Sequence, residues 1–289
     1  SQSYISFLLT IINFYLIYKI AKHFELDNQK SLLLAVFFVF GSVFTPLLAL
    51  PASWYFAQVV AATLLIWAIY EFLNKRRYFL IGFALALATA TRFNLIFASL
   101  FFFFYLFKKP LNIINIIKFV SPIILSVAIL SIYNYQRFGN ALETGYNLQI
   151  IYDQADSRRA EGLFSLKHIP ANIYYMLFQG PEPVLKDKSH NLSPPYITFN
   201  NYGLSLFFIS PILFLIFRAN YKKDLIKNCA TTIIFMLLPI ITYYGIGQKQ
   251  VSFRYALDFF PFIFLIIADT TKKVSIKFKE GSSNLDLEN

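Results

Sequence analysis

The sequence predicts an all-α, polytopic transmembrane helical bundle, and three observations support this. The chain of 289 residues is 57% hydrophobic and only 14% charged. Its apolar residues form runs of roughly twenty residues with few charges, the length that a helix needs to cross a bilayer. The basic residues, which give a net charge of +11, fall mostly in short connections between these runs, a pattern typical of cytoplasmic loops.

The apolar segments and their interruptions set the expected organisation. The segments are 4–20, 31–50, 53–73, 78–91, 93–107, 113–135, 200–217, 228–246 and 251–269. We expect about seven full spans and one two-legged hairpin, judged against the thickness of a bilayer. Residues 1–270 would form the transmembrane bundle, with one large outer loop at 136–199, and residues 271–289 a polar cytoplasmic tail.

The hairpin is predicted from a single charge, Arg92, in the middle of the apolar run 78–107. As one helix this run would be about 45 Å long, against a hydrocarbon core of roughly 30 Å. The connections 75–77 and 108–109 are both basic and fit the same side of the membrane. We therefore expect the run to fold back at "TRFN", 91–94, with a tip that opens into a water-filled cavity. The alternative is one long tilted helix whose arginine snorkels to the interface.

The distribution of basic residues also predicts orientation. If the first segment runs from outside to inside, most Lys and Arg residues fall on the inner side. We expect a multi-pass protein of a prokaryotic cell membrane, with Ser1 outside and Asn289 in the cytoplasm. The opening "SQSYISFLLT" lacks an initiator Met and the features of a signal peptide, so we expect the chain to begin partway through a longer membrane protein.

The outer loop 136–199 is too long for a simple connector. Pro170 near its start and Gly180-Pro181 as a stop predict a short interfacial helix over 167–178. Ile169, Ile173 and Leu177 would share one face of that helix. Residues 189–196, "SHNLSPPY", read as an extended return to the next span.

Two arginines are candidates for binding an anion. Arg254 and Asp258 stand four residues apart, which on a helix suits an ion pair that aids packing. Alternatively, Arg254 binds phosphate oxygens at the mouth of the last span, since a guanidinium group contacts them bidentately. Arg92 is expected near the same outer leaflet, and two arginines at similar depth suit a pyrophosphate or a phosphodiester.

The stretch "YNYQRFGNALETGY", 133–146, is the densest polar and aromatic segment. It holds Arg137, Glu143 and Tyr146, which could form a wall for a polar headgroup at the rim of the same cavity. The alternative is an ordinary helix exit with interfacial aromatic residues.

Other chemistry is weakly indicated or excluded. Asp153 and Asp156 could bind a divalent cation, although two acids three residues apart are also common in solvated loops. No other cofactor is indicated, because His168 and His190 lack zinc-ligand spacing and no phosphate-binding glycine loop or nucleophilic triad is present. Cys229 is the single cysteine, so an internal disulfide is impossible. Nucleic acid is not an expected partner, because no basic face with interleaved aromatics lies outside the membrane.

Several stretches together resemble one family. The segment "LPASWYFAQVVAATLLIWAIYEFLNKRRYFLIGFALALATATRFNLIF", 50–97, is similar to the central part of bacterial GT-C superfamily glycosyltransferases, which include protein mannosyltransferases and arabinosyl transferases. The segments 133–146, "NNYGLSLFFISPILFL" at 200–215 and "SFRYALDFFPFIFLIIA" at 252–268 resemble later elements of such proteins. The resemblance covers most of residues 1–270, and its motifs are loose and rich in apolar residues.

The resemblance implies a membrane enzyme that passes a hexosyl or pentosyl group from a polyprenyl-phosphate sugar, at the outer face, to a glycan, lipid or protein acceptor. The catalytic acid, usually an Asp in the first outer loop, would lie upstream of Ser1, so the chain would be a C-terminal portion that is inactive alone. Arg92 and Arg254 would stabilise the departing lipid phosphate. A second hypothesis is a flippase or transporter of an anionic lipid-linked glycan, without chemistry. A third is a noncatalytic membrane scaffold.

Overall fold

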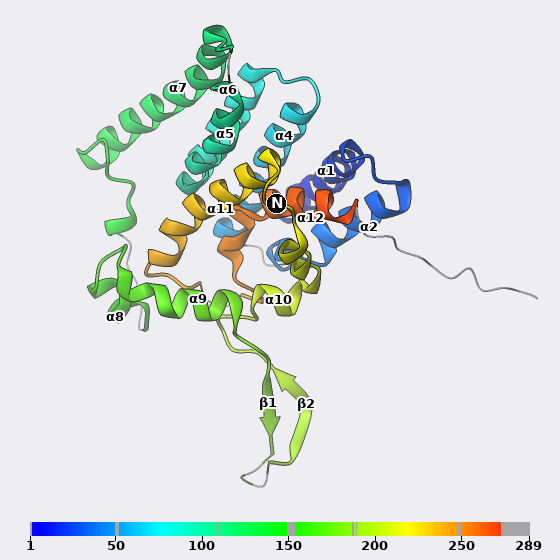
Figure 1. Ribbon diagram of the computed structural model, residues 1–289. Helices are drawn as coiled ribbons and strands as arrows, with labels where there is room; N and C mark the ends of the chain where they lie inside the picture. Colours follow the sequence, from blue (N-terminus) through cyan, green and yellow to red (C-terminus); the bar gives the residue numbers. More distant parts are fainter. Residues whose placement is uncertain are drawn as a thin grey trace, which may run out of the picture.

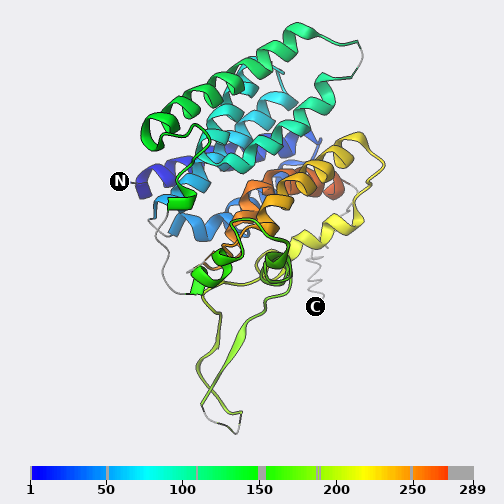
Figure 2. The same ribbon diagram turned by 90° about the vertical axis from the view of Figure 1, so that its left-hand side faces the viewer.

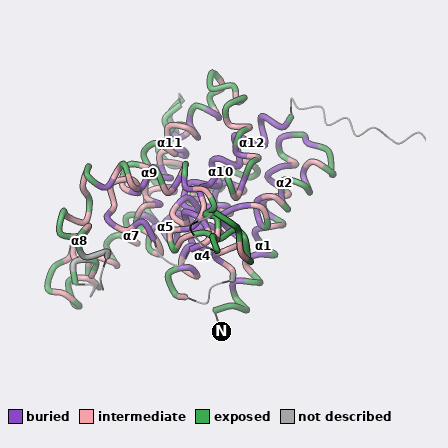
Figure 3. Tube along the Cα trace, turned by 90° about the horizontal axis from the view of Figure 1, so that it is seen from below, coloured by how far each residue is buried: buried purple, intermediate pink, exposed green. Residues whose placement is uncertain are grey.

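A computed structural model describes residues 2–49, 52–108, 110–148, 154–186, 188, 190–247 and 250–272. The expected tail lies outside these residues from position 273 onward, as do Ser1 and Asn289. Within the described part the chain is a bundle of helices with one small two-stranded sheet (Figure 1). The buried part of the trace gathers at the centre of the bundle (Figure 3). This confirms the all-α class.

The elements follow in this order along the chain. The first half comprises α1 (Gln2–His23), α2 (Asn28–Phe40), α3 (Phe44–Ala49), α4 (Ser53–Leu73), α5 (Tyr78–Thr91), η1 (Phe93–Ala98), α6 (Ser99–Leu106) and α7 (Ile113–Phe138). The second half comprises η2 (Tyr146–Leu148), α8 (Gln154–Ala160), η3 (Leu166–His168), α9 (Ile169–Leu177), β1 (Glu182–Leu185), β2 (Leu192–Thr198), α10 (Leu206–Ile209), η4 (Pro211–Arg218), α11 (Asp224–Thr242), η5 (Arg254–Asp258) and α12 (Phe260–Thr271). Elements named η are 3₁₀-helices.

Four helices in the described residues are long and apolar enough to cross a membrane: α1, α4, α7 and α11. The other three expected full spans, 31–50, 200–217 and 251–269, do not form single helices of that length. The first breaks at Gly41, the second at Ser210-Pro211, and the third begins as the 3₁₀-helix η5 before Pro261. Glycine and proline end helices because one lacks a Cβ and the other lacks the amide donor.

The two-legged hairpin is present. Helix α5 ends at Thr91, Arg92 takes an extended conformation with φ −146° and ψ 106°, and η1 starts the return leg. The return leg brings Tyr105 back to Phe72 at the end of α4, with ring centroids 4.9 Å apart. The connections on either side of the hairpin therefore lie at one end of the bundle, and the single long helix is excluded.

Contacts between loops define that end, here called the basic end. Lys272 pairs with Glu25, Lys108 with Asp224, and Lys223 with Asp269. These pairs join the connections after α1, α6 and η4 to the start of α11 and the end of α12. The opposite end, here called the site end, carries Arg92 and the described residues within 139–205 and 243–253. Which end faces the cytoplasm stays a prediction.

Helices α5 and α7 pack closely because a glycine stands at their crossing. A Cβ atom at Gly82 would meet the carbonyl oxygen of Phe119 well inside van der Waals distance. Further along, Ser126 Oγ donates to the carbonyl of Ala86 at 3.4 Å, so the two helices run in the same direction. The views in Figures 1 and 2 agree that α4, α5 and α7 lie side by side.

The site end is covered by the outer segment. The predicted helix at 167–178 is present as η3 and α9 and lies across the ends of the long helices in Figure 1. Its buried face holds Asn172 and Met176, while Ile169, Ile173 and Leu177 are half-buried beside it. The expected extended return is strand β2, and it pairs with β1 in a hairpin that projects from the bundle (Figures 1 and 2).

Asn172 fixes this cover to the bundle. Its Nδ2 donates to the carbonyls of Ile241 at 2.7 Å and Tyr243 at 2.8 Å, at the end of α11, where helical carbonyls have no intrahelical partner. Arg158 donates from Nε to the carbonyl of Tyr244 at 2.7 Å. Burial lowers the pKa of Arg158, which is consistent with its place beneath the cover.

Candidate anion-binding site

The hairpin tip meets the start of the last helix at the site end, through Arg92 and Asp258. Arg92 Nε and Nη2 donate to the two carboxylate oxygens of Asp258 at 2.7 and 2.9 Å. Asn94 Nδ2 donates to the same carboxylate at 3.2 Å. The Asp258 side chain is 2% exposed and that of Arg92 18%. This bidentate, nearly buried pair fixes the hairpin tip to η5.

The expected helical pair of Arg254 with Asp258 is therefore wrong. Residues 254–258 form a 3₁₀-helix, which has three residues per turn, so that side chains four apart do not share a face. The carboxylate is instead bound by an arginine 166 residues away in sequence. This long-range partner leaves Arg254 available for another role.

Arg254 lies between two tyrosine rings. Its guanidinium carbon is 5.2 Å from the ring centroid of Tyr55 and 4.8 Å from that of Tyr255, and Nη2 donates to the Tyr255 hydroxyl at 3.1 Å. Both distances are in the range of cation–π attraction. No carboxylate pairs with Arg254 within the part of the chain that the structure describes. Its Nε is buried and makes no hydrogen bond to the described residues.

Tyr255 links the two arginines. The Arg92 guanidinium carbon lies 5.7 Å from the same ring centroid that Arg254 contacts. The two predicted anion-binding residues are therefore neighbours, as expected from their depth. The two guanidinium groups have different partners, because that of Arg92 binds the Asp258 carboxylate and that of Arg254 lies against two tyrosine rings.

A chain of tyrosine rings continues outward from this pair. The ring centroids of Tyr255 and Tyr243 are 6.0 Å apart, and those of Tyr243 and Tyr146 are 6.4 Å apart. Tyr146 is 46% exposed. Tyr146 thus lies at the outer end of this chain of rings, and its role in binding a headgroup stays a prediction.

Arg137 and Glu143 contact residues of their own segment. Arg137 Nη1 donates to the Tyr133 hydroxyl at 3.3 Å, and its guanidinium carbon lies 4.9 Å from the Phe138 ring centroid. A carboxylate oxygen of Glu143 accepts from the Gly145 amide at 2.6 Å. These contacts fit the helix-exit alternative, and the role of both residues in a headgroup wall stays a prediction.

The possible cation pair cannot be placed. Asp153 and the side chain of Asp156 lie outside the described residues. Among the residues that are described, no group of three His, Cys, Asp or Glu side chains is arranged to hold a metal ion.

The structure adds residues that sequence patterns did not single out. Gln58 on α4 is 1% exposed, and its Nε2 donates to the carbonyl of Arg254 at 3.2 Å, while its Oε1 is buried without a hydrogen-bond partner among the described residues. Tyr55, one helical turn before Gln58, lies under Arg254. The sequence signal that could have identified Gln58 is a polar side chain in the first turns of an apolar span, because such residues commonly face a functional interior.

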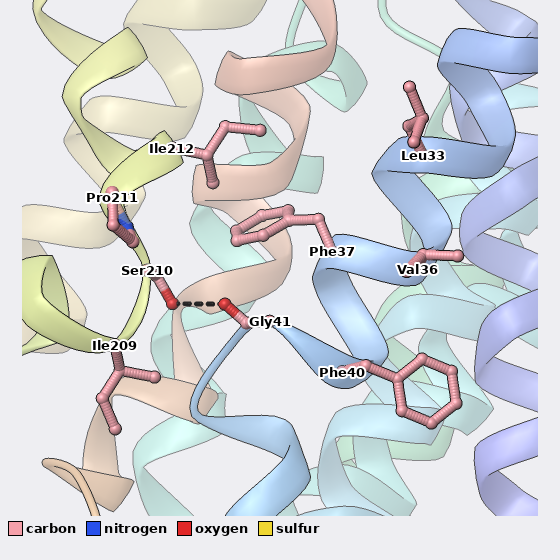
Figure 4. Close-up of a pocket in the computed structure, with 9 residues that line it drawn as sticks. All are labelled: Leu33, Val36, Phe37, Phe40, Gly41, Ile209, Ser210, Pro211 and Ile212. Atoms are coloured by element: carbon pink, nitrogen blue, oxygen red, sulfur yellow. Dashed lines mark hydrogen bonds between the residues drawn. The ribbon is translucent and has the colours of Figure 1, made fainter.

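Two apolar grooves lie apart from this site. One, of about 390 Å³, runs between α2 and the start of η4, where Ser210 Oγ donates to the carbonyl of Gly41 at 2.7 Å (Figure 4). The other, of about 270 Å³, lies between η4 and α11. Neither is lined by Arg92 or Arg254, so the expected water-filled cavity at the hairpin tip is not one of them.

The site end thus carries a guanidinium group that has no acidic partner in the described part of the chain and is flanked by tyrosine rings. Guanidinium groups in general bind phosphate oxygens bidentately. Comparison of the chain with protein-family models, curated proteins and solved structures finds no match.

Proposed function

We propose that the chain is the donor-binding, C-terminal portion of a membrane glycosyltransferase that uses a polyprenyl-phosphate-linked sugar at the site end. The observation that carries the proposal is Arg254, a half-buried guanidinium group with a buried, unpartnered Nε and no acidic partner among the described residues. Burying a charged donor without a partner costs several kcal/mol. A bound phosphate would offset that cost.

The tyrosines support the same ligand. A phosphate carried on a polyprenyl lipid enters from the bilayer with its sugar on the far side. Tyr146 at the rim offers a ring face and a hydroxyl group to that sugar, and Tyr255 supplies a hydroxyl group beside Arg254. Aromatic rings with one polar atom suit a boundary where one side is apolar and the other is wet.

The two arginines then have different roles. Arg254 binds the phosphate directly. Arg92 acts through Tyr255 and Asp258, whose positions it fixes. This revises the expectation of two equivalent phosphate ligands, since a guanidinium group already bound bidentately to a carboxylate has little capacity left for a second anion.

The reaction that follows is an inverting displacement. The acceptor hydroxyl attacks the anomeric carbon, the bond from that carbon to the phosphate oxygen breaks, and the polyprenyl phosphate departs with the negative charge. Arg254 stabilises that developing charge. The base that takes the acceptor proton is unassigned among the described residues.

The orientation in the membrane is part of the proposal. The site end faces outward and the basic end faces the cytoplasm of a prokaryotic cell, in keeping with the rule for basic loops. In a Cys229→Ala background, single cysteines at Asn74 and Asn112 should both be labelled only from the cytoplasmic side. Labelling of either from outside would contradict this orientation.

Transfer and transport can be told apart in one experiment. Membranes that contain the protein in its natural full-length context are given a panel of hexosyl and pentosyl polyprenyl phosphates. The proposal expects release of polyprenyl phosphate with transfer of the sugar, and loss of both in Arg254→Gln. Movement of a labelled lipid-linked glycan across the membrane without release would favour the flippase alternative instead.

A further inference from the structure

The groove between η4 and α11 has its floor on helix α12. Phe259, just before α12, and Ile263 and Ile266 of α12 form this floor, and both η4 and α11 pack on α12. The two walls hardly contact each other, so a channel is left between them. Its volume of about 270 Å³ is below the roughly 300–1,000 Å³ typical of drug-sized ligand pockets, so it suits one narrow chain.

The lining of the groove is apolar along its length. At the site end it is closed by Met176 and Leu177 of α9, and toward the basic end it reaches Tyr221. The Tyr221 hydroxyl donates to the carbonyl of Ile216, so Tyr221 contributes its ring to the groove and no free hydroxyl group. The groove therefore offers van der Waals contact and no hydrogen-bonding site along most of its length.

The groove lies at the surface of the bundle. One wall consists of η4 with Leu206 and Phe207 of α10, and the other wall is α11. Ile234 on this wall is 58% exposed and Phe217 on the edge is 70% exposed, which in a bilayer means contact with alkyl chains.

Three cations lie close in sequence to lining residues at the foot of the groove. Arg218 follows the lining residue Ile216 by two positions, and Lys222 follows Tyr221 directly. Lys227 precedes Ala230 and Ile234 by three and seven residues on α11, so it shares their face. All three side chains are exposed, and none forms an ion pair with a described residue. The nearest acids are already engaged, Asp224 with Lys108 and Asp269 with Lys223.

From this combination we infer a binding site for an anionic phospholipid of the leaflet at the basic end. One acyl chain lies in the groove between η4 and α11, and the headgroup phosphate is bound by Arg218, Lys222 and Lys227. Charge selects the ligand, because a zwitterionic lipid offers the same chains without the net negative charge. The site is distinct from Arg254, which lies at the other end of the bundle, and it stands whether or not the chain takes part in glycosyl transfer.

The test is a lipid titration of the purified protein, read by native mass spectrometry. Phosphatidylglycerol and phosphatidylcholine with identical acyl chains are compared. Each basic residue near an anionic lipid contributes about fivefold in affinity, so Lys222→Gln/Lys227→Gln should weaken phosphatidylglycerol binding about 25-fold. Binding of phosphatidylcholine should stay unchanged.

Two further variants separate this site from general charge attraction. Lys19→Gln/Lys30→Gln removes two charges from helices α1 and α2, away from the groove, and should leave the preference intact. Ala230→Phe fills the groove and should abolish the preference for phosphatidylglycerol, whereas Val127→Phe on the exposed face of α7 should not.

Equal binding of the two lipids by the unmodified protein would overturn the inference, as would equal losses in the Lys222/Lys227 and Lys19/Lys30 variants. If groove variants instead change the number of chains per particle, the face is a contact between copies of the chain and the lipid site is wrong. Because Lys222 and Lys227 are exposed, their variant tests the site even if Ala230→Phe fails to fold.

Discussion

Removing the carboxylate of Asp258 should destabilise the bundle more than any other single loss of charge described above. In Asp258→Ala, Arg92 keeps its charge without a partner and Asn94 loses its acceptor. Breaking a buried pair from one side costs about 3–5 kcal/mol. Because Arg92 keeps 18% exposure and its contact with the Tyr255 ring, we expect the lower part of that range, about 3 kcal/mol.

Cys229 provides the assay. It is the only cysteine in the chain and is fully buried, so a thiol-reactive dye labels it only when the bundle opens. A loss of about 3 kcal/mol should lower the unfolding midpoint in detergent by on the order of 5–10 °C. The matched control is Asp224→Ala, which breaks an exposed pair with Lys108 and should lower the midpoint by no more than about 2 °C, since such pairs contribute about 0–1 kcal/mol.

The double variant Arg92→Leu/Asp258→Leu makes the reasoning refutable. Replacing both members of a buried pair by apolar residues is often neutral, so the double variant should recover most of the lost stability. The pair does not hold the hairpin tip to η5 if Asp258→Ala unfolds like the unmodified protein. The same conclusion follows if the double variant loses as much stability as Arg92→Leu and Asp258→Leu lose together when measured separately.

Three other perturbations have defined outcomes. Gly82→Ala should cost about 1–3 kcal/mol by forcing α5 and α7 apart, measured by the same thiol assay, while Gly180→Ala, whose Cβ would meet only the Phe208 ring at 3.4 Å, should be tolerated. Asn172→Ala removes the hydrogen-bond donor to the end of α11, at a cost of about 1–3 kcal/mol. Trypsin should then cut faster at Arg158, Arg159 and Lys167. Unchanged cleavage would show that Asn172 does not hold the outer segment on the bundle. The hydrogen bond from Lys272 is the largest cause of a pKa of Glu25 below its ordinary 4.5, so the stability that the pair contributes is complete above pH 4.5 and is lost as the pH falls through the lowered pKa. Glu25→Gln should abolish this acid-dependent part of the stability, measured in thermal scans of Trp54 and Trp67 fluorescence. An identical pH profile in both proteins would contradict the prediction.

The fold class and the hairpin could be predicted because both depend on local patterns. Helix length, hydropathy and the position of basic loops are properties of consecutive residues, and Arg92 stands out in an apolar run for that reason. The breaks at Gly41 and Ser210-Pro211 were less predictable, since a glycine or proline inside an apolar run is tolerated in many membrane helices. The number of continuous spans was overestimated at those places.

The proximity of the candidate residues could be predicted in part. Arg92, Arg254 and Tyr146 were selected from charge, depth and aromatic content, and they lie around one cluster of tyrosines. The partner of Asp258 was wrong because the choice between a neighbour four residues away and one 166 residues away depends on tertiary structure. The 3₁₀ conformation of 254–258, which decides that choice, leaves no periodic signal in five residues.

The most direct test of the proposed function is the affinity of the protein for a polyprenyl phosphate, compared with the same polyprenol lacking the phosphate. The account predicts that the phosphate form binds at least tenfold more tightly, since a charge-assisted bond to a phosphate is worth about 1.5–3 kcal/mol. Arg254→Gln should erase that difference, Arg254→Lys should restore part of it, and Ala230→Phe in the separate groove should not affect it. Equal binding of the two lipids by the unmodified protein, or an undiminished preference for the phosphate in a folded Arg254→Gln variant, would contradict the account.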